Sequence, residues 1–327
     1  MAIPGPLNSI CDVPGIEVGN AEDRDLLTGV TVILPDAPVT CAVDHRGGAI
    51  GARETVSLRP GSVGGIAHAI CLSGGSAYGL DAAGGVMHGL RAMGRGFELA
   101  GAVVPIVPST IIFDLAFGEQ RDWMHPPWWD LGTKALVAAS SQFSLGNAGA
   151  GLGATAGPLK GGLGSASLIH EGTTLGAIAV VNPVGSTVMP GTDTFWGWTR
   201  ALEGEVGNQH SPAHMQKLDP PTHAKPGENT TLVVVATDAK LDRDQALRVA
   251  IMAQDGLAHA IRPVHSPLDG DTVFVLSMGT AEAPNPWHGV STLGTMAADV
   301  TARAIMRGVY EAESLAGVPS YREVHGP

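Results

Sequence analysis

Cysteine is scarce in this sequence, which has only Cys11, Cys41 and Cys71 among its 327 residues. Three cysteines so far apart in the chain form neither a disulfide framework nor a C-x-x-C metal pair. Chains without disulfides are typical of reducing compartments, so we expect a cytoplasmic location.

Positive charge is also scarce, because 19 lysine and arginine residues stand against 31 aspartate and glutamate residues. The formal net charge is -12 at pH 7. Such an acidic surface repels the phosphates of DNA and RNA, so we expect no nucleic-acid partner.

Long apolar runs are missing. Residues 135–159 and 172–192 carry no charge, but Gly, Pro, Ser, Thr and Asn interrupt both stretches. A membrane span must be apolar as well as uncharged, so neither stretch fits one. The first residues lack the basic and apolar regions of a secretory signal. We therefore expect no membrane partner.

Sequence motifs for cofactors and metals are weak or absent. The phosphate-loop motif G-x-x-x-x-G-K-[ST] and the nucleophile elbow G-x-S-x-G do not occur. The run from Gly151 to Ala156 resembles a dinucleotide turn, but no clear strand precedes it. His210 and His214 have the spacing of metal ligands on a helix, which Pro212 between them opposes. We expect no cofactor and no metal.

Glycine is abundant, with 45 residues and no Gly-X-Y period. Short apolar runs alternate with glycine turns in both halves of the chain, which predicts an α/β class, and we expect a single domain over residues 1–327. The apolar patterns predict strands at 31–34, 41–44, 66–72, 103–107, 111–115, 175–181, 230–237 and 272–277, and helices at 77–93, 134–140, 243–260 and 291–311. Asp242 is the predicted N-cap of the third helix.

Residues 208–229 differ from the rest of the chain. They hold four prolines and three histidines and show no apolar period, which predicts an exposed linker. Thr230 follows at the first position of a β-rich run. This is the arrangement that a self-cleaving hydrolase with an N-terminal nucleophile requires.

In such an enzyme, the Thr230 hydroxyl attacks the Asn229 carbonyl, and hydrolysis of the resulting ester frees the Thr230 α-amine. An α-amine titrates near ~8 and can serve as the base for the hydroxyl on the same residue. By itself, an Asn-Thr pair at the start of a strand is ordinary, because Asn favours turns and Thr favours strands.

Six motifs in order along the chain resemble those of the D-aminopeptidase/β-peptidyl aminopeptidase family, which includes the nylon-oligomer (6-aminohexanoate-oligomer) hydrolases. The motifs are Asp12-Val-Pro-Gly-Ile-Glu-Val-Gly19, Asp44-His-Arg-Gly-Gly48, Leu72-Ser-Gly-Gly-Ser-Ala-Tyr-Gly-Leu80, Gly149-Ala-Gly-Leu-Gly153, Val181-Asn-Pro-Val-Gly185 and Asn229-Thr230-Thr231 with the apolar run behind it.

The resemblance implies an N-terminal-nucleophile-like αββα sandwich, with two central sheets covered by helices. It implies cleavage between Asn229 and Thr230 into an α-chain, 1–229, and a β-chain, 230–327. It implies a homo-oligomer as well, up to a tetramer of αβ units. By position, Asn182 matches the family's oxyanion-stabilising asparagine; without the match, it reads as a turn-capping residue before a proline.

Asp269 and Asp271, in an Asp-Gly-Asp tripeptide, match the two residues that support the family's nucleophile. Read alone, the tripeptide is a turn. The nylon-oligomer hydrolases have paired aspartates here, whereas the β-aminopeptidases have a serine and a glutamate. Two close carboxylates raise one pKa, so we expect an orienting and proton-relay role.

Two positions depart from the nylon-oligomer hydrolases. Their lysine directly follows Ala-Gly, where this chain has a proline; either Lys160 fills the role from a shifted position or the role is vacant. Their active-site tyrosine is replaced by Phe113, which donates no hydrogen bond. Phe113, Asp114 and Tyr78 are candidates for contact with the substrate, and Asp114 could hold a substrate ammonium.

These features predict an amide hydrolase that uses Thr230 through an acyl-enzyme. The Asp-Gly-Asp tripeptide favours oligoamides cut internally, such as 6-aminohexanoate (nylon) oligomers. The alternatives are an aminopeptidase for short peptides or β-peptides, an ornithine-acetyltransferase-like acyl transferase, and an assembly protein without activity.

Overall fold

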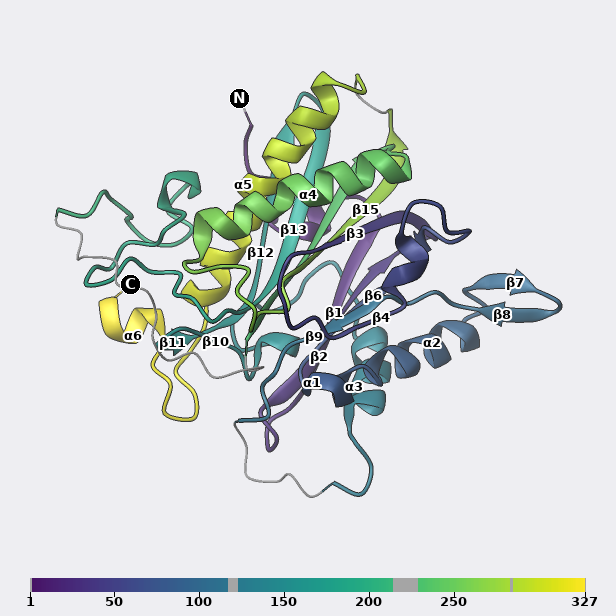
Figure 1. Ribbon diagram of the computed structural model, residues 1–327, viewed down its shortest axis with the longest axis horizontal. Helices are drawn as coiled ribbons and strands as arrows, with labels where there is room; N and C mark the ends of the chain where they lie inside the picture. The colour runs from purple at the N-terminus through teal and green to yellow at the C-terminus, as the bar shows by residue number, and fades with distance from the viewer. Residues whose placement is uncertain (1, 117–122, 214–228, 283–284, 327) are drawn as a thin grey trace.

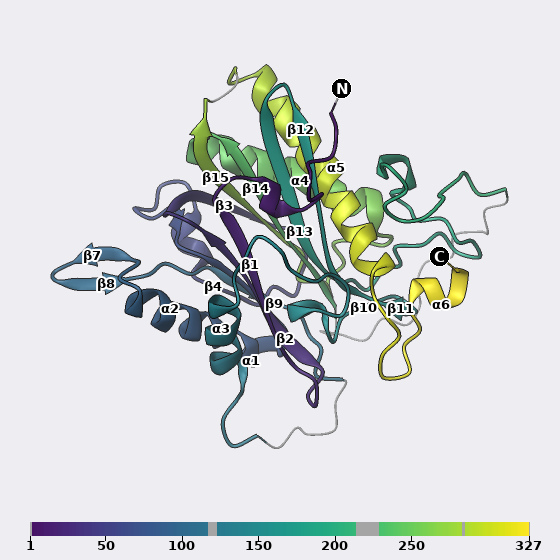
Figure 2. The ribbon, with the colours of Figure 1, turned by 180° about the vertical axis from the view of Figure 1, so that it is seen from behind.

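The computed structural model describes residues 2–116, 123–213, 229–282 and 285–326. Two β-sheets stack face to face, and helices cover the outer face of each (Figures 1 and 2). Helices α4 (Arg243–Ala260) and α5 (His288–Tyr310) cover the larger sheet. Helices α2 (Ala82–Ala92) and α3 (Trp128–Val137) cover the smaller one. This confirms the predicted αββα sandwich.

The larger sheet has six strands in the order β12 (Gly162–His170), β13 (Thr173–Asn182), β14 (Thr230–Ala239), β15 (Thr272–Ala281), β3 (Val39–His45) and β5 (Ile66–Ala67). Strands β14 and β15 run parallel, and every other neighbouring pair is antiparallel.

Every residue of β14 is buried. Successive side chains of a strand point to opposite faces of the sheet. Val233 and Val235 therefore pack toward the helices, whereas Leu232 and Val234 pack between the two sheets. Burial on both faces explains why this strand is a continuous apolar run and does not alternate.

The smaller sheet has five strands in the order β1 (Ile16–Asp23), β2 (Thr28–Pro35), β6 (Ile70–Ser73), β9 (Ser109–Ile111) and β4 (Ala52–Arg53). The remaining elements are short: α1 (Ser76–Gly79), α6 (Tyr321–His325), the hairpin β7 (Phe97–Leu99) and β8 (Ala102–Val104), the pair β10 (Thr155–Ala156) and β11 (Leu159–Lys160), and the 3-10 turns Ile10–Asp12, Thr55–Leu58, Gly149–Gly151 and Trp198–Arg200.

The structure confirms the helix predicted at 243–260 at both ends, and it confirms the strands predicted at 175–181, 230–237 and 272–277 within longer ones. Of the predicted linker 208–229, residues 214–228 lie outside the described part of the chain, and so does His214.

Two predicted elements are wrong in a way that shapes the fold. The run at 66–72 is two strands in different sheets, because His68 and Ala69 turn the chain and the His68 ring accepts a hydrogen bond from Ile106 N (3.1 Å). The helix predicted at 77–93 is divided into α1 and α2 around Leu80 and Asp81.

The structure also contains long strands that the apolar patterns did not predict, β1 and β12. Glycines interrupt their patterns, and the packing explains why. A Cβ atom on Gly164 would lie 2.0 Å from the carbonyl oxygen of Ala304 in α5, and one on Gly19 would lie 1.9 Å from that of Ala135 in α3. Glycine therefore lets each helix approach its strand closely.

Within the described residues, no helix combines the length and the apolar character that crossing a bilayer demands.

Asp242 and Gln245 form a capping box at the start of α4, and a substitution can test its contribution to stability. The Asp242 side chain accepts from Gln245 N (2.8 Å), and the Gln245 side chain accepts from Asp242 N (3.0 Å). We expect Asp242→Ala to lower the free energy of unfolding by about 1 kcal/mol, because Gln245 N loses the side-chain oxygen that caps it. Urea denaturation measures it. Asp255→Ala, on the exposed face of the same helix, is the control; an equal loss in both variants would contradict the capping role.

Candidate active site

Four of the predicted site residues meet at one edge of the larger sheet. Thr230, the first residue of β14, pairs with Asn182, the last residue of the antiparallel strand β13. On the other side, Asn229 forms a bridge with Asp269, just before the parallel strand β15. The strand order therefore brings together residues that are far apart in the sequence.

The Thr230 hydroxyl is buried and has two partners. It accepts a hydrogen bond from Gly270 N (3.0 Å) and donates one to the carbonyl oxygen of Asn229. A Cβ atom on Gly270 would lie 2.7 Å from the Thr230 Oγ1 atom and 2.8 Å from the Ala49 carbonyl oxygen. Only glycine therefore lets this N–H reach the hydroxyl. The hydroxyl therefore lies beside the carbonyl of the peptide group that joins residues 229 and 230.

Both aspartates of the Asp-Gly-Asp segment (residues 269–271) are buried. Asp271 Oδ1 accepts from Thr231 N (2.8 Å), and its Oδ2 bonds the backbone N (3.0 Å) and ring Nδ1 (2.8 Å) of His265. Asp269 Oδ1 accepts from Val184 N (3.0 Å), and its Oδ2 accepts from the N (3.1 Å) and Oγ (2.6 Å) of Ser266.

The surroundings of the Asp-Gly-Asp segment affect its charge. Burial raises the pKa of Asp269, and the nearby charge of Asp271 raises it further. His265 and Ser266 were not predicted from the sequence, because isolated polar residues in the loop before a strand form no pattern. Their closeness in sequence to Asp269 and Asp271 is the one signal that could have indicated them.

Asn182 is buried, and its side chain is held at both ends. Its Oδ1 accepts from Thr155 N (2.8 Å), and its Nδ2 donates to the carbonyl oxygen of Phe113 (3.3 Å). The backbone donor at Thr155 orients the amide, so the N–H groups point away from Thr155. Phe113 reaches the site through its backbone, in a bond that does not depend on its side chain.

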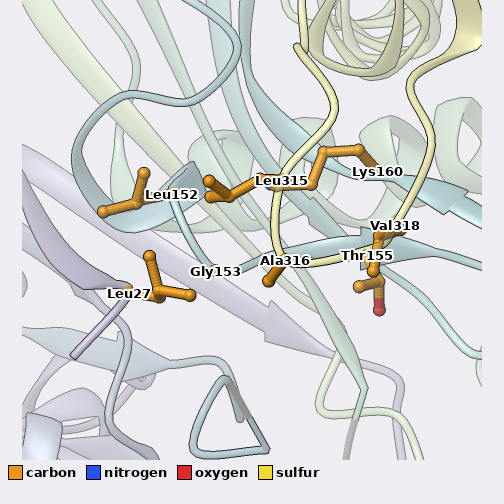
Figure 3. Close-up of a pocket in the computed structure, with 8 residues that line it drawn as sticks. All are labelled: Leu27, Leu152, Gly153, Thr155, Lys160, Leu315, Ala316 and Val318. Carbon is orange, nitrogen blue, oxygen red and sulfur yellow. The ribbon is translucent and has the colours of Figure 1, made fainter. Parts of the chain in front are cut away.

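Lys160 is buried, and its ammonium donates to three carbonyl oxygens, of Gly151 (3.0 Å), Ala154 (2.8 Å) and Gly161 (2.9 Å). Burial lowers the pKa of Lys160 to about 7, and the charge of Asp114 opposes this shift. Lys160 and Thr155 line one small cavity, and Leu315, Ala316 and Val318 line it as well (Figure 3). Thr155 also pairs with Lys160 between β10 and β11, so Lys160 is linked to Asn182 through Thr155.

Asp114 and Tyr78 lie in different surroundings. Asp114 is buried, and its carboxylate accepts from Thr28 Oγ1 (2.8 Å) and Gly75 N (2.7 Å). Burial raises the pKa of Asp114 to about 6, although these two bonds and Lys160 favour its charged form. Tyr78 is about half exposed and packs against Trp128, with 6.3 Å between ring centroids. Contact of either residue with substrate stays a prediction.

The described residues contain no group of three or more His, Cys, Asp or Glu side chains that could hold a metal ion.

Residues 8–322 match the family model described as peptidase family S58. The chain belongs to this family. An uncharacterized aminopeptidase of Mycobacterium tuberculosis is 43% identical over 343 residues, which cover 97% of this chain and 98% of the relative. A 6-aminohexanoate-oligomer endohydrolase of Kocuria sp. is 31% identical over 305 residues, which cover 89% of this chain and 80% of the relative.

Two solved structures share the fold of this family S58 chain. A β-aminopeptidase of Burkholderia sp. superposes with a TM-score of 0.70 at 23% identity, covering 98% of this chain and 91% of its own. The L-aminopeptidase D-Ala-esterase/amidase of Ochrobactrum anthropi, described as a variant of the Ntn hydrolase fold, superposes with a TM-score of 0.70 at 20% identity, covering 98% and 90%. The family and the fold agree with the sequence analysis: this is a peptidase-type amide hydrolase on an Ntn hydrolase fold.

The buried Lys160 makes stability depend on pH in a definite direction. In the unfolded chain its pKa is ~10.4, above the folded value of about 7. Between these values the unfolded chain binds one more proton, so the folded state gains stability as the pH rises, by at most about 1.4 kcal/mol per pH unit. We expect the free energy of unfolding of the wild type, relative to Lys160→Met, to increase from pH 7 to pH 10. Urea titrations measure it, and parallel pH profiles would contradict the burial of a titrating amine.

Proposed function

We propose that this chain is a self-processing amide hydrolase in which Thr230 becomes an N-terminal nucleophile. The observation that carries this proposal is the position of the Thr230 hydroxyl. It lies between the Gly270 N–H and the Asn229 carbonyl, at the start of a fully buried central strand. A hydroxyl held against the preceding peptide carbonyl is the starting geometry for an N-to-O acyl shift.

In the maturation step, Thr230 Oγ1 attacks the Asn229 carbonyl carbon and loses its proton. The bond from this carbon to the Thr230 nitrogen breaks, the nitrogen takes up the proton, and an ester joins the two residues. Water then hydrolyses the ester. The products are a carboxylate on Asn229 and a threonine with a free α-amine and a free hydroxyl.

In turnover, the α-amine of Thr230 accepts the hydroxyl proton while Oγ1 attacks the substrate amide. The proton passes to the leaving amine, and the acyl group stays on Thr230 as an ester until water releases it as a carboxylic acid. Asn182 supports the tetrahedral intermediate through its Nδ2–H groups. Its bond to the Phe113 carbonyl is long (3.3 Å), so exchanging this partner for an oxyanion costs little.

The Asp-Gly-Asp segment contributes to both steps in this proposal. Its Gly270 N–H orients the hydroxyl, and Asp271 fixes the peptide group that follows Thr230 through Thr231 N. Cleavage would free the Thr230 nitrogen beside the bridge between Asn229 and Asp269. The raised pKa of Asp269 suits a proton carrier next to this amine.

For the substrate, we propose oligoamides cut internally, such as 6-aminohexanoate oligomers. The Kocuria relative bears this activity in its name. The burial of Asp114, whose carboxylate is already bonded to Thr28 and Gly75, also disfavours it as a surface group for a substrate ammonium. An aminopeptidase is the second candidate, favoured by the 43% identical relative named as one.

Removing the hydroxyl of Thr230 tests the nucleophile. We expect Thr230→Ala to remain a full-length, folded and inactive chain, whereas the wild type separates under denaturing conditions into residues 1–229 and 230–327. Thr230→Ser is the control, because it keeps a hydroxyl and should still be cleaved. Intact mass and N-terminal sequencing measure this, with Thr-Thr-Leu-Val expected at the new end. Cleavage of Thr230→Ala, or at another bond, would rule out the mechanism.

Blocking the substrate amine separates the two substrate classes. We expect a 6-aminohexanoate oligomer and its N-acetylated form to be hydrolysed at rates within about threefold of each other, because internal cleavage needs no free ammonium. An aminopeptidase would reject the acetylated oligomer. Chromatography of the products from matched substrate pairs gives the ratio, with Thr230→Ala as the blank, and loss of activity on the blocked oligomer would favour the second candidate.

A further inference from the structure

The side chain of His265 is hydrogen-bonded to the carboxylate of Asp271, which also accepts a bond from the backbone of Thr231. His265 belongs to the loop between α4 and β15 and contacts Asp271 Oδ2 twice, through its backbone N (3.0 Å) and its ring Nδ1 (2.8 Å). The other oxygen of Asp271 accepts from Thr231 N (2.8 Å). One carboxylate thus joins the histidine to the backbone of the strand that begins with Thr230.

We propose that His265 is a positioning residue for Thr230, which acts through Asp271 on the peptide group between Thr230 and Thr231. This inference rests on the proposed function. His265 itself contacts neither the Thr230 hydroxyl nor its carbonyl neighbour in the described part of the chain. Its effect is to fix the rotation of the Asp271 side chain and thereby the direction of the first peptide of β14.

The conformation of His265 supports this role. Its φ angle is +54°, in the left-handed region that residues with a Cβ atom seldom adopt. Such a backbone persists only where its surroundings hold it, and here the two bonds to Asp271 offset the strain. The left-handed turn is what allows one residue to present both its backbone N–H and its ring to a single carboxylate oxygen.

The charges around Asp271 explain why a second donor matters. Asp271 is buried two residues from Asp269, and its charge raises the pKa of Asp269. Hydrogen bonds to a carboxylate favour its charged form. A charged Asp271 carboxylate can only accept, and toward it Nδ1 of His265 is the donor. Without this donor, Oδ2 would keep only the backbone N–H of His265, and the side chain would be held by two bonds in place of three.

A change at Asp271 reaches the hydroxyl by a short path. The residue before it, Gly270, donates its N–H to Thr230 Oγ1 (3.0 Å), and the carbonyl of Asp271 accepts from Arg46 N (3.0 Å). The Asp-Gly-Asp segment is therefore held from four sides: by β14, by His265 and Ser266, by the chain after β3, and by Val184 after β13. His265 is the one side-chain donor to Asp271 among the described residues, so its removal loosens this carboxylate by one of its three bonds and leaves the bonds to Asp269 unchanged.

Three substitutions test the position of the donor. His265→Asn places an amide N–H near the location of Nδ1, His265→Gln places it near Nε2, and His265→Leu removes it. We expect His265→Leu and His265→Gln to slow formation of the 230–327 fragment and to lower kcat on the order of tenfold, because a misplaced nucleophile loses rate. KM should stay within about twofold. His265→Asn should recover most of both rates. His288→Leu, at an exposed histidine, is the control.

The comparison of the three variants distinguishes positioning from general support of the fold. If only stability mattered, the rates of His265→Asn and His265→Gln would follow their unfolding midpoints and not the donor position. Wild-type rates in His265→Leu, or equal rates in the Asn and Gln variants, would overturn the positioning role of His265. The proposed function would still stand in that case, because the wild type would be cleaved and active. A wild-type chain that is neither cleaved nor active would instead remove the proposed function itself.

Discussion

The hydrogen bond from Gly270 N to the Thr230 hydroxyl is the contact on which the rest of this site depends. It requires that a backbone N–H come within hydrogen-bond distance of a buried hydroxyl, which in turn requires a residue without a Cβ atom. It also requires that β14 and β15 lie side by side in parallel, so that the residues preceding β15 meet the first residue of β14. Helices α4 and α5 make this pairing stable by covering the outer face of both strands.

Much of the fold was predictable because its signals are local. The apolar run after Thr230, the capping residue Asp242 and the period of α4 each depend on a few neighbouring residues. The two longest strands that were missed, β1 and β12, have glycines where helices pack against them. The requirement for glycine comes from partners more than one hundred residues away, such as Ala304 against Gly164, and no local pattern contains it.

The site shows the same division between local and distant information. Thr230, Asn182 and the paired aspartates belong to motifs that resemble those of a known family, and the strand order brings all of them to one edge of the larger sheet. Their hydrogen-bond partners Thr155, in the short strand β10, and His265, in the loop before β15, belong to no such motif. Their identity could not be predicted, because a lone polar residue has many ordinary explanations and only the folded chain shows its partner.

The order of strands in the larger sheet has a consequence for the lifetime of the protein. Residues after 229 contribute β14 and β15, which lie between β13 on one side and β3 on the other. A break in the chain before Thr230 would leave two pieces that interleave within one sheet, so neither could leave without taking the core apart. Folding before the break is a unimolecular process, whereas reassembly afterwards would be bimolecular and dependent on concentration. Unfolding of the cleaved protein would therefore be difficult to reverse, because the covalent connection that first brought its two halves together would be lost.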